Sequence, residues 1–286
     1  MACGVLNESG TDYIYCVGGS QATFTTGTGR VFRYNPVTDT ISTVPADWPG
    51  ANGDTTLPGG FAVVNNKLYI MGGFQINTQM VSQTWEFDPA TLTWTQKTDM
   101  PVARGYIPAT AIGTDIYTAG GSTCVTCMTD LTDTDDSFKY DTVADAWSAI
   151  TNIPRITAET RALTFCNKVY VMGGGRTAPN PSNEVDVYDP DTNSWSTDLP
   201  FVMARRNFAT NTDSTNNIWL AGGYGPTDSM EIFNCPVSPC GAPSPTPTPT
   251  PSVSPSPTPT VTPTPTPIRV TPTPRPRPTP HPRPTP

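Results

Sequence analysis

Short apolar runs that end in two glycines recur along the chain at nearly constant intervals. The glycine pairs end at Gly19, Gly73, Gly121, Gly174 and Gly223, which gives intervals of 54, 48, 53 and 49 residues. Clusters of Pro, Gly, Asn and Asp separate the runs, and no long stretch shows the 3.6-residue apolar period of an amphipathic helix. The pattern predicts an all-β protein built from five repeats.

A second signal follows each glycine pair: an aromatic residue and then Asn or Asp, often with Pro. These aromatic residues are Tyr34, Phe87, Tyr140, Tyr188 and Phe233. Seven residues further along stand Ile41, Trp94, Trp147, Trp195 and Cys240. A constant spacing across a turn is typical of a hairpin with fixed register, because a slip by one residue would move the Trp to the opposite face.

Each repeat is expected to form four short strands, of which the second carries the glycines, the third the aromatic residue and the fourth the Trp. The weakly patterned first strands are predicted at 61–64, 108–112, 163–166 and 208–211. One such sheet cannot cover both of its faces, so the repeats must pack on one another around an axis. The expected repeats are 2–48, 57–100, 104–153, 158–200 and 206–240.

The combination of Gly-Gly, Tyr-Asp-Pro and Trp resembles the kelch repeat over about residues 2–240. The resemblance implies a β-propeller of about five four-stranded blades. The last repeat lacks its Trp and ends in Cys235-Pro-Val-Ser-Pro-Cys240, which does not suit an inner strand, so the last blade is expected to be incomplete. A closed or nearly closed ring of five blades and a fragment of a larger ring both remain open.

The composition changes near residue 242. Nineteen of the 34 prolines lie between Pro243 and Pro286, in Thr-Pro and Arg-Pro steps that cannot build a core. We expect a propeller over residues 1–241 and a disordered, extended spacer over 242–286. Such spacers resemble the linkers of secreted bacterial proteins. A passive tail, attachment to a cell envelope, a glycosylated stalk and a link to another module are its alternative roles.

The charges are also divided unevenly. All 24 acidic residues but only 12 of the 16 basic residues precede Pro243, so nucleic acid is not an expected partner. No apolar segment is long enough for membrane insertion. The single histidine, His281, lies in the spacer. The body therefore lacks an imidazole for copper chemistry of the galactose-oxidase type, and no cofactor is expected.

Seven cysteines indicate an oxidising compartment and an extracellular or cell-surface location, although the sequence starts without an export signal. The predicted disulfides are Cys3–Cys16, Cys124–Cys127 and Cys235–Cys240. The first follows from a hairpin in which Leu6 faces Tyr13, because that register places the two cysteines opposite each other. A redox motif and half a zinc site are alternatives for the second pair. Cys166 would remain as a buried thiol.

Long loops are expected on one face of the propeller, where loops between the second and third strands and loops between blades emerge together. These loops are 20–30, 74–83, 122–137 and 175–183 within blades, and 44–60, 98–106, 150–161 and 198–207 between blades. Binding is expected on this face. The predicted ligand-binding residues are Arg104, Arg161, Arg176, Arg206, Phe74 and Tyr224.

The prediction depends mainly on two of these arginines, which stand at equivalent positions of their repeats. Arg104 and Arg206 each precede the Ile of their Gly-Gly strand by twelve residues, and arginines near the channel mouth are similarly placed in peptide-binding kelch domains. Bidentate hydrogen bonds to a carboxylate ligand are one role for them. The alternative is a pair with a neighbouring acid, such as Asp99 or Glu159, that holds the blades together.

An acidic loop beside the third glycine pair is a weak calcium candidate. Its carboxylates are Asp130, Asp133, Asp135 and Asp136. Calcium binds six to eight oxygens, but the spacing is not that of an EF-hand and acidic loops are usually solvated.

Two functions remain. The favoured one is a non-catalytic extracellular recognition domain that binds a protein or a glycan. The alternative is a metal-free carbohydrate-active enzyme similar to kelch-type sialate mutarotases, for which Glu159 with Arg161 is the one pair that the sequence offers.

Overall fold

The computed structural model describes residues 1–20, 25–127, 129–175, 180–213, 217–224 and 228–234. These residues form strands and loops, apart from one turn of 3-10 helix, η1 (Pro49–Ala51). All of the strands belong to one compact unit, Met1–Ser244, whereas a second unit, Pro245–Pro286, lies outside the described residues together with the predicted spacer. No helix in the described ranges is long and apolar enough to cross a membrane.

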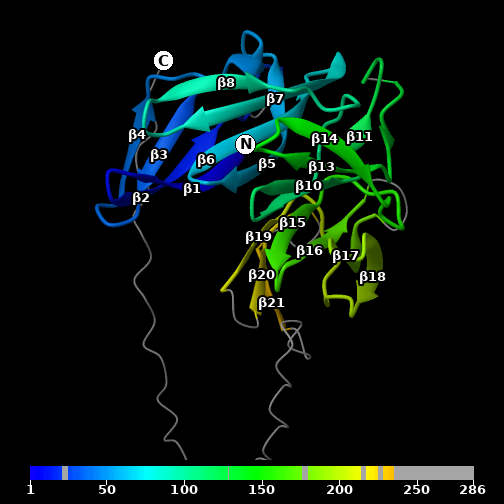
Figure 1. The fold of residues 1–286 in the computed structure, drawn as a ribbon. Coiled ribbons are helices and arrows are strands. Elements are labelled where there is room, and N and C mark those ends of the chain that lie inside the picture. Colours follow the sequence, from blue (N-terminus) through cyan, green and yellow to red (C-terminus); the bar gives the residue numbers. More distant parts are fainter. Residues whose placement is uncertain (21–24, 128, 176–179, 214–216, 225–227, 235–286) are drawn as a thin grey trace, which may run out of the picture. The chain divides into compact units, whose positions relative to one another are not determined.

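Five antiparallel sheets follow one another along the chain, one for each repeat (Figure 1). Blade 1 contains β1 (Ala2–Glu8), β2 (Thr11–Val17), β3 (Val31–Asn35) and β4 (Thr40–Val44). Blade 2 contains β5 (Thr56–Val64), β6 (Lys67–Gln75), β7 (Gln79–Asp88) and β8 (Thr93–Lys97). Blade 3 contains β9 (Ala109–Ile112), β10 (Asp115–Ala119), β13 (Ser137–Asp141) and β14 (Ala146–Ile150), and β11 (Ser122–Thr123) pairs separately with β12 (Thr132–Asp133).

Blade 4 contains β15 (Arg161–Phe165), β16 (Lys168–Gly174), β17 (Ser182–Asp189) and β18 (Ser194–Asp198). Blade 5 contains β19 (Ala209–Thr212), β20 (Asn217–Ala221) and β21 (Met230–Asn234). The all-β propeller with five blades is therefore confirmed. The described part of blade 5 has three strands, and the irregular segment 235–240 lies outside it.

The predicted register of the outer hairpins is confirmed in four blades. The facing pairs are Tyr34 and Ile41, Phe87 and Trp94, Tyr140 and Trp147, and Tyr188 and Trp195. Each Trp also reaches the preceding blade, because its indole N–H donates to a carbonyl there. These bonds run from Trp94 to Ala46 (2.8 Å), from Trp147 to Thr98 (2.9 Å) and from Trp195 to Thr151 (2.7 Å). The constant spacing thus serves contact between blades.

The repeated Gly-Gly pair has a steric reason. Gly72 and Gly173 have φ values of 60° and 62°, in the left-handed region that favours glycine. A Cβ atom at Gly72 would collide with the carbonyl of Arg104, and one at Gly173 with the carbonyl of Arg205. The loop that enters the next blade therefore passes directly over the first glycine of each pair, where no side chain fits.

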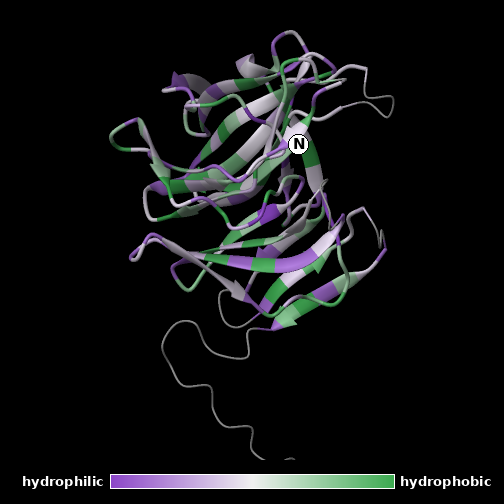
Figure 2. Cartoon of the chain, turned by 90° about the vertical axis from the view of Figure 1, so that its right-hand side faces the viewer, coloured by the Kyte–Doolittle hydropathy of each residue, from purple (hydrophilic) through white to green (hydrophobic). Residues whose placement is uncertain are grey.

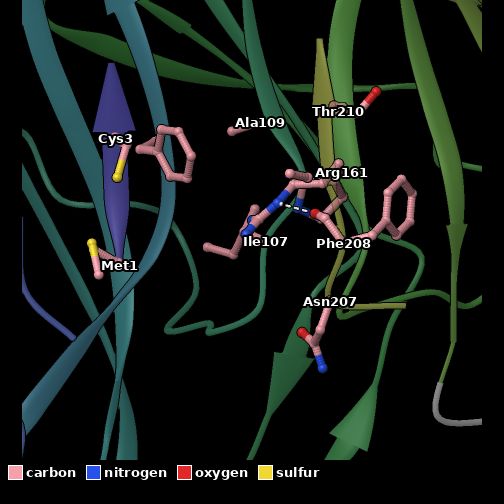
Figure 3. A pocket seen from close by; sticks show the side chains of 12 residues that line it. Met1, Cys3, Ile107, Ala109, Arg161, Asn207, Phe208 and Thr210 are labelled. Atoms are coloured by element: carbon pink, nitrogen blue, oxygen red, sulfur yellow. Dashed lines mark hydrogen bonds between the residues drawn. The ribbon is translucent and has the colours of Figure 1, made fainter. Parts of the chain in front are cut away.

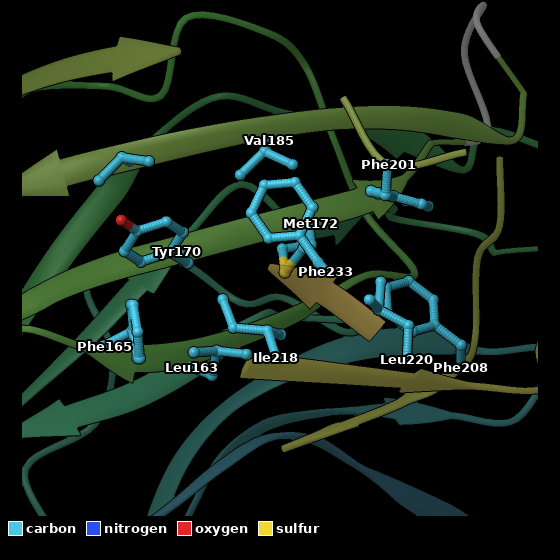
Figure 4. Packing of buried hydrophobic residues seen from close by; sticks show 11 residues of the cluster. Leu163, Phe165, Tyr170, Met172, Val185, Phe201, Phe208, Ile218, Leu220 and Phe233 are labelled. Atoms are coloured by element: carbon cyan, nitrogen blue, oxygen red, sulfur yellow. The ribbon is translucent and has the colours of Figure 1, made fainter. Parts of the chain in front are cut away.

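The core is divided into four hydrophobic clusters, each between two consecutive blades. Figure 4 shows the cluster between blades 4 and 5, where Tyr170 and Met172 of β16 face Ile218 and Leu220 of β20. Hydrophobic and hydrophilic positions alternate along several strands, because successive side chains of a strand point to opposite faces of its sheet (Figure 2). The first strands contact one another in the order β1, β5, β9, β15 and β19 and surround a central channel.

Two of the predicted disulfides are present. Cys3 bonds to Cys16 in the expected register, with Leu6 opposite Tyr13, and Cys124 bonds to Cys127. The prediction that Cys166 is a free thiol was wrong, because this residue is disulfide-bonded. It lies half-buried in the turn between β15 and β16, at the edge of the core rather than inside it. Cys235, Cys240 and the bond predicted between them lie outside the described residues.

Candidate functional site

A cavity of about 430 Å³ opens where the first strands of the blades converge. Its lining is mostly apolar and comes from all five blades. The lining residues that matter below are Met1, Phe61, Ile107, Arg161, Asn207 and Phe208. A second recess of about 140 Å³ shares Met1, Phe61, Arg161 and Asn207 with it and continues past Phe74, Tyr106 and Glu159. We call the two together the channel mouth.

Arg161, the first residue of β15, is the cation of this cavity (Figure 3). Its Nε donates to the carbonyl of Phe208 at 2.9 Å, and its guanidinium carbon lies 5.6 Å from the ring centre of Phe61. Among the described residues no carboxylate forms an ion pair with it. Burial lowers the pKa of Arg161. A cationic side chain therefore lies in a cavity with many apolar lining residues.

Three loop residues at equivalent positions form a chain of contacts along the mouth. Tyr106, Glu159 and Asn207 have φ values of 55°, 54° and 52°, which are unusual for side-chain-bearing residues other than Asn and Asp. The amide of Glu159 donates to the carbonyl of Tyr106 (3.2 Å), and that of Asn207 donates to the carbonyl of Glu159 (2.7 Å). These bonds connect blades 3, 4 and 5 at the mouth, and they hold the strained backbone in place.

The structure brings four of the predicted ligand-binding residues to this region: Arg161, Arg206, Phe74 and Tyr224. Arg206 forms an ion pair with Glu159 at 2.9 Å and lies 4.4 Å from the ring centre of Tyr224, whose side chain is exposed. Phe74 packs on Tyr106 with ring centres 5.6 Å apart. Arg176 lies outside the described residues. The rim of the mouth is therefore aromatic, and its Arg206 charge is already balanced.

Arg104 was predicted to bind ligand and is instead part of the framework. Its side chain is 2% exposed and is paired with Asp136, with a further hydrogen bond to Thr134. Burial lowers the pKa of Arg104, while Asp136 acts in the opposite direction. The pair with an acid that was the alternative for this residue is therefore present, but the acid is Asp136 of the same blade rather than Asp99, so the pair lies within blade 3.

Two further framework arginines were missed. Arg155 bonds to Asp186 (2.5 Å) and to the carbonyl of Gly173 (2.9 Å). Arg205 is fully buried, bonds to the carbonyl of Gly222 (3.0 Å) and pairs with Glu231 (3.4 Å). In both cases the arginine of an entering loop reaches a glycine of a Gly-Gly pair and an acid on the third strand.

The predicted equivalence of Arg104 and Arg206 was wrong. The amide of Gly73 donates to the carbonyl of Arg104, and the amide of Gly174 donates to the carbonyl of Arg205, each at 2.8 Å. Arg205 is therefore the counterpart of Arg104. The last repeat has one additional residue between Arg205 and the Ile of its Gly-Gly strand. Counting back twelve residues from that Ile therefore gives Arg206 instead of Arg205.

The calcium candidate finds no support in the described part of the chain, where no three Asp, Glu, His or Cys side chains are grouped for a metal. Three of the four aspartates use their carboxylates for separate partners, and the fourth, Asp135, contributes its backbone carbonyl. Asp130 accepts hydrogen bonds from the amides of Val125 and Thr126, and Asp133 accepts one from Ser122. Asp136 pairs with Arg104, and the carbonyl of Asp135 accepts from Ile153. The aspartates thus organise the loop itself.

Apolar side chains are exposed on the loops that enter blades 3, 4 and 5. They are Val102, Ile156, Val202 and Met203, with Val202 85% exposed. Sequence alone did not single them out, although each follows a Pro or Phe of the same connecting loops. Exposed apolar side chains on loops that also contribute to the channel mouth are typical of a surface that binds protein.

Comparison with known proteins gives a consistent picture. A family model described as the KLHDC2/KLHL20/DRC7 Kelch-repeats domain matches residues 5–223. Kelch-like protein 25 of Xenopus tropicalis is 29% identical over 139 residues, which are 48% of this chain and 22% of that protein. The Kelch repeat-containing protein kel-10 of Caenorhabditis elegans is 29% identical over 168 residues (56% and 27%), and Beta-scruin of Limulus polyphemus is 25% identical over 177 residues (57% and 18%). Each match covers less than a third of the relative.

Proposed function

From the premise that this chain belongs to the kelch-repeat family, whose domains generally mediate protein interactions, we propose that it is a non-catalytic domain that recognises a protein partner through its loop face. An acidic group of the partner enters the channel mouth and pairs with Arg161. Apolar side chains of the partner pack on the exposed residues of the connecting loops.

The observation that carries this proposal is the charge of Arg161, for which the described part of the chain supplies no carboxylate partner. A half-buried cation without a counter-charge is unfavourable, and an entering carboxylate restores the balance that the framework arginines already have. The guanidinium geometry also suits a planar, bidentate acceptor. Because the rest of the propeller is acidic, this cavity is where an anionic group is attracted rather than repelled.

An extracellular or cell-surface location belongs to the same proposal. Disulfides such as Cys3–Cys16 and Cys124–Cys127 form and persist in oxidising compartments. The spacer after residue 242 then serves as the link to a cell envelope or to another module. A glycan with a carboxylate is the second ligand class compatible with Arg161, and the exposed apolar loop residues favour protein over it.

The enzyme alternative needs Glu159 and Arg161 to act together on a substrate. Glu159 is held instead by Arg206 (2.9 Å) and by the side-chain amide of Asn207 (2.8 Å). Arg161 bonds to a backbone carbonyl. Both contacts favour a structural task for Glu159 and a binding task for Arg161.

The test is an array of acidic peptides and acidic glycans, followed by calorimetry on the tightest ligand. Arg161→Ala should weaken that ligand by about 10- to 100-fold, the usual effect of losing a charged hydrogen bond. Converting the ligand's carboxylate to an amide should have the same effect. Arg30→Ala is the matched control, because Arg30 is an exposed arginine outside the cavity.

Each outcome is informative. Equal weakening by Arg161→Ala and Arg30→Ala would mean that only the overall charge attracts the ligand. Unchanged binding in Arg161→Ala would remove the channel mouth from the proposal. A tight ligand found only among the glycans would replace protein by carbohydrate as the partner.

A further inference from the structure

Among the described residues, blade 3 alone has a separate two-stranded sheet between its second and third main strands. The strands of this sheet, β11 and β12, form a hairpin, and the Cys124–Cys127 disulfide lies in the connecting segment directly after β11. A Cys-x-x-Cys pair can be a permanent part of the framework or a bond that exchanges with other thiols. The surroundings of the two sulfurs distinguish these possibilities.

The Cys3–Cys16 and Cys124–Cys127 disulfides differ in what holds their sulfurs together. Cys3 and Cys16 face each other in a hairpin whose strands are each 7 residues long. These strands keep the two thiols opposite each other even when the bond is reduced, so the bond re-forms readily. Cys124 and Cys127 lie beyond the paired residues of β11, and no strand pairing in the described chain holds them. The Cys124–Cys127 bond is therefore the more easily reduced of the two.

The two sulfurs of this bond also differ in access. Cys127 is 9% exposed, whereas Cys124 is half-buried. The residues between them are exposed, and Val125 is 83% exposed. An incoming thiolate therefore reaches the sulfur of Cys124, and the sulfur of Cys127 is the leaving group.

The disulfide holds a residue that connects blade 3 to blade 2. The amide of Cys127 donates to the carbonyl of Thr78, in the turn between β6 and β7, at 3.2 Å. The carboxylate of Asp130 accepts hydrogen bonds from the amides of Val125 and Thr126 (3.0 and 2.9 Å), but these bonds lie within the hairpin loop. The contact with blade 2 thus depends on the position of Cys127.

The hairpin of β6 and β7 forms part of the wall of the channel mouth. Phe74 of β6 packs on Tyr106 with ring centres 5.6 Å apart, and both line the smaller recess. Gly105 exchanges two backbone hydrogen bonds with Ser122 of β11 (3.0 and 2.8 Å). A Cβ atom at Gly105 would collide with the sulfur of Met80 in β7. The extra hairpin, the loop that enters blade 3 and the β6–β7 hairpin are therefore in contact beside the recess.

We propose that Cys124–Cys127 is a reversible redox site, at which a dithiol opens the disulfide. One thiolate of the dithiol attacks the sulfur of Cys124, the S–S bond breaks, and the Cys127 thiolate leaves and takes a proton from water. The second thiolate of the dithiol then attacks the reductant's own sulfur in the mixed disulfide, and Cys124 leaves and is protonated in turn. The protein gains two thiols, and the dithiol is oxidised to an intramolecular disulfide.

Reduction affects the two ends of the hairpin differently. At the outer end, Cys127 loses the covalent bond that keeps its amide beside the carbonyl of Thr78. At the inner end, the hydrogen bonds between Ser122 and Gly105 remain. The tip of the hairpin therefore detaches from blade 2 while the propeller stays folded, and the wall of the channel mouth loses one of its contacts.

Reduction of the full chain in buffers of reduced and oxidised dithiothreitol tests the order of the two bonds. Free thiols are alkylated at each ratio, and peptide mass spectrometry distinguishes Cys124–Cys127 from Cys3–Cys16. The first bond should be half reduced at a ratio of reduced to oxidised dithiothreitol at least about tenfold lower than the second. Equal ratios, or the opposite order, would overturn the proposal.

Hydrogen exchange measures what the bond holds. After selective reduction, the amide of Cys127 should exchange at least about tenfold faster and that of Gly105 by a smaller factor, while the amides of β16 in blade 4 keep their rates. Cys124→Ser with Cys127→Ser should reproduce this result without reductant. Val125→Ser, in the same loop with the disulfide intact, is the matched control and should exchange like the unaltered protein.

Unchanged exchange at Cys127 after reduction would show that the disulfide holds no contact with blade 2 and would overturn the proposal. Faster exchange throughout the propeller would also overturn it, because the bond would then belong to the framework. Neither measurement uses a ligand of Arg161, so the outcome is independent of the proposed function.

Discussion

Two kinds of buried or half-buried arginine lie at the inner ends of the loops that enter the blades, and they differ in what balances their charge. Arg104, Arg155 and Arg205 each have a carboxylate from their own blade, which lies on the third strand for Arg155 and Arg205 and just before it for Arg104. Arg161, at the start of β15, has a backbone carbonyl and an aromatic ring instead. The residue type is the same in both kinds. Arg104, Arg155 and Arg205 form ion pairs within their blades, whereas the guanidinium of Arg161 has no such pair among the described residues.

The comparison shows that an arginine count is a poor guide to a binding site. Burial lowers the pKa of both Arg104 and Arg161, yet only Arg104 has an acid that acts against this. The functional distinction lies in the missing counter-charge, and substitutions at the two kinds of site should therefore have opposite consequences for stability and binding.

The largest effect is expected at Arg205. Arg205→Ala leaves Glu231 without its cation and empties a fully buried site, which should lower the free energy of unfolding by about 3 kcal/mol. Chemical denaturation followed by tryptophan fluorescence measures it. Loss of less than about 0.5 kcal/mol would show that Arg205 is not part of the framework.

A smaller effect is expected from Arg155→Lys, which keeps the charge but loses the forked contact. Lysine cannot bond at once to Asp186 and to the carbonyl of Gly173, so we expect a loss of about 1–2 kcal/mol. The same denaturation assay applies, with Lys168→Arg as its control, because the Lys168 side chain is more accessible and pairs with Asp189 alone. A neutral result would mean that the positive charge alone matters at this position.

The smallest effect concerns a half-buried pair near the surface, Arg33 with Glu8, and depends on pH. The Arg33 hydrogen bond lowers the pKa of Glu8 below its unfolded value, so its contribution is present above about pH 4.3 and is lost as the pH falls through the lowered value. Glu8→Gln should therefore reduce the Tm slightly at pH 7 and leave it unchanged at pH 2–3. A difference that grows on acidification would contradict this sign.

Much of the fold could be predicted from the sequence because its determinants are local. The Gly-Gly pairs, the spacing between Tyr188 and Trp195 and the hairpin that joins Cys3 to Cys16 each depend on residues close together in the chain. They specify turns and register, and the register in turn specifies which faces must be covered.

The site was harder because it depends on contacts between distant segments. Arg161 meets Phe61 and Phe208 only after three blades have packed, so no spacing in the sequence distinguishes it from Arg104. One additional residue in the last repeat was enough to replace Arg205 by Arg206 in the predicted alignment. The disulfide bond of Cys166 was missed as well, because the sequence analysis had paired the other six cysteines with one another.

The most direct test of this account measures ligand affinity and Tm together for Arg161→Ala and Arg205→Ala. The account predicts that Arg161→Ala binds its acidic ligand about 10- to 100-fold more weakly while its Tm stays within about 1 °C of the unaltered protein. Arg205→Ala should instead lose several degrees and, where still folded, retain its affinity. If Arg161→Ala unfolds like Arg205→Ala, or binds as tightly as the unaltered protein, the channel mouth is not the recognition site.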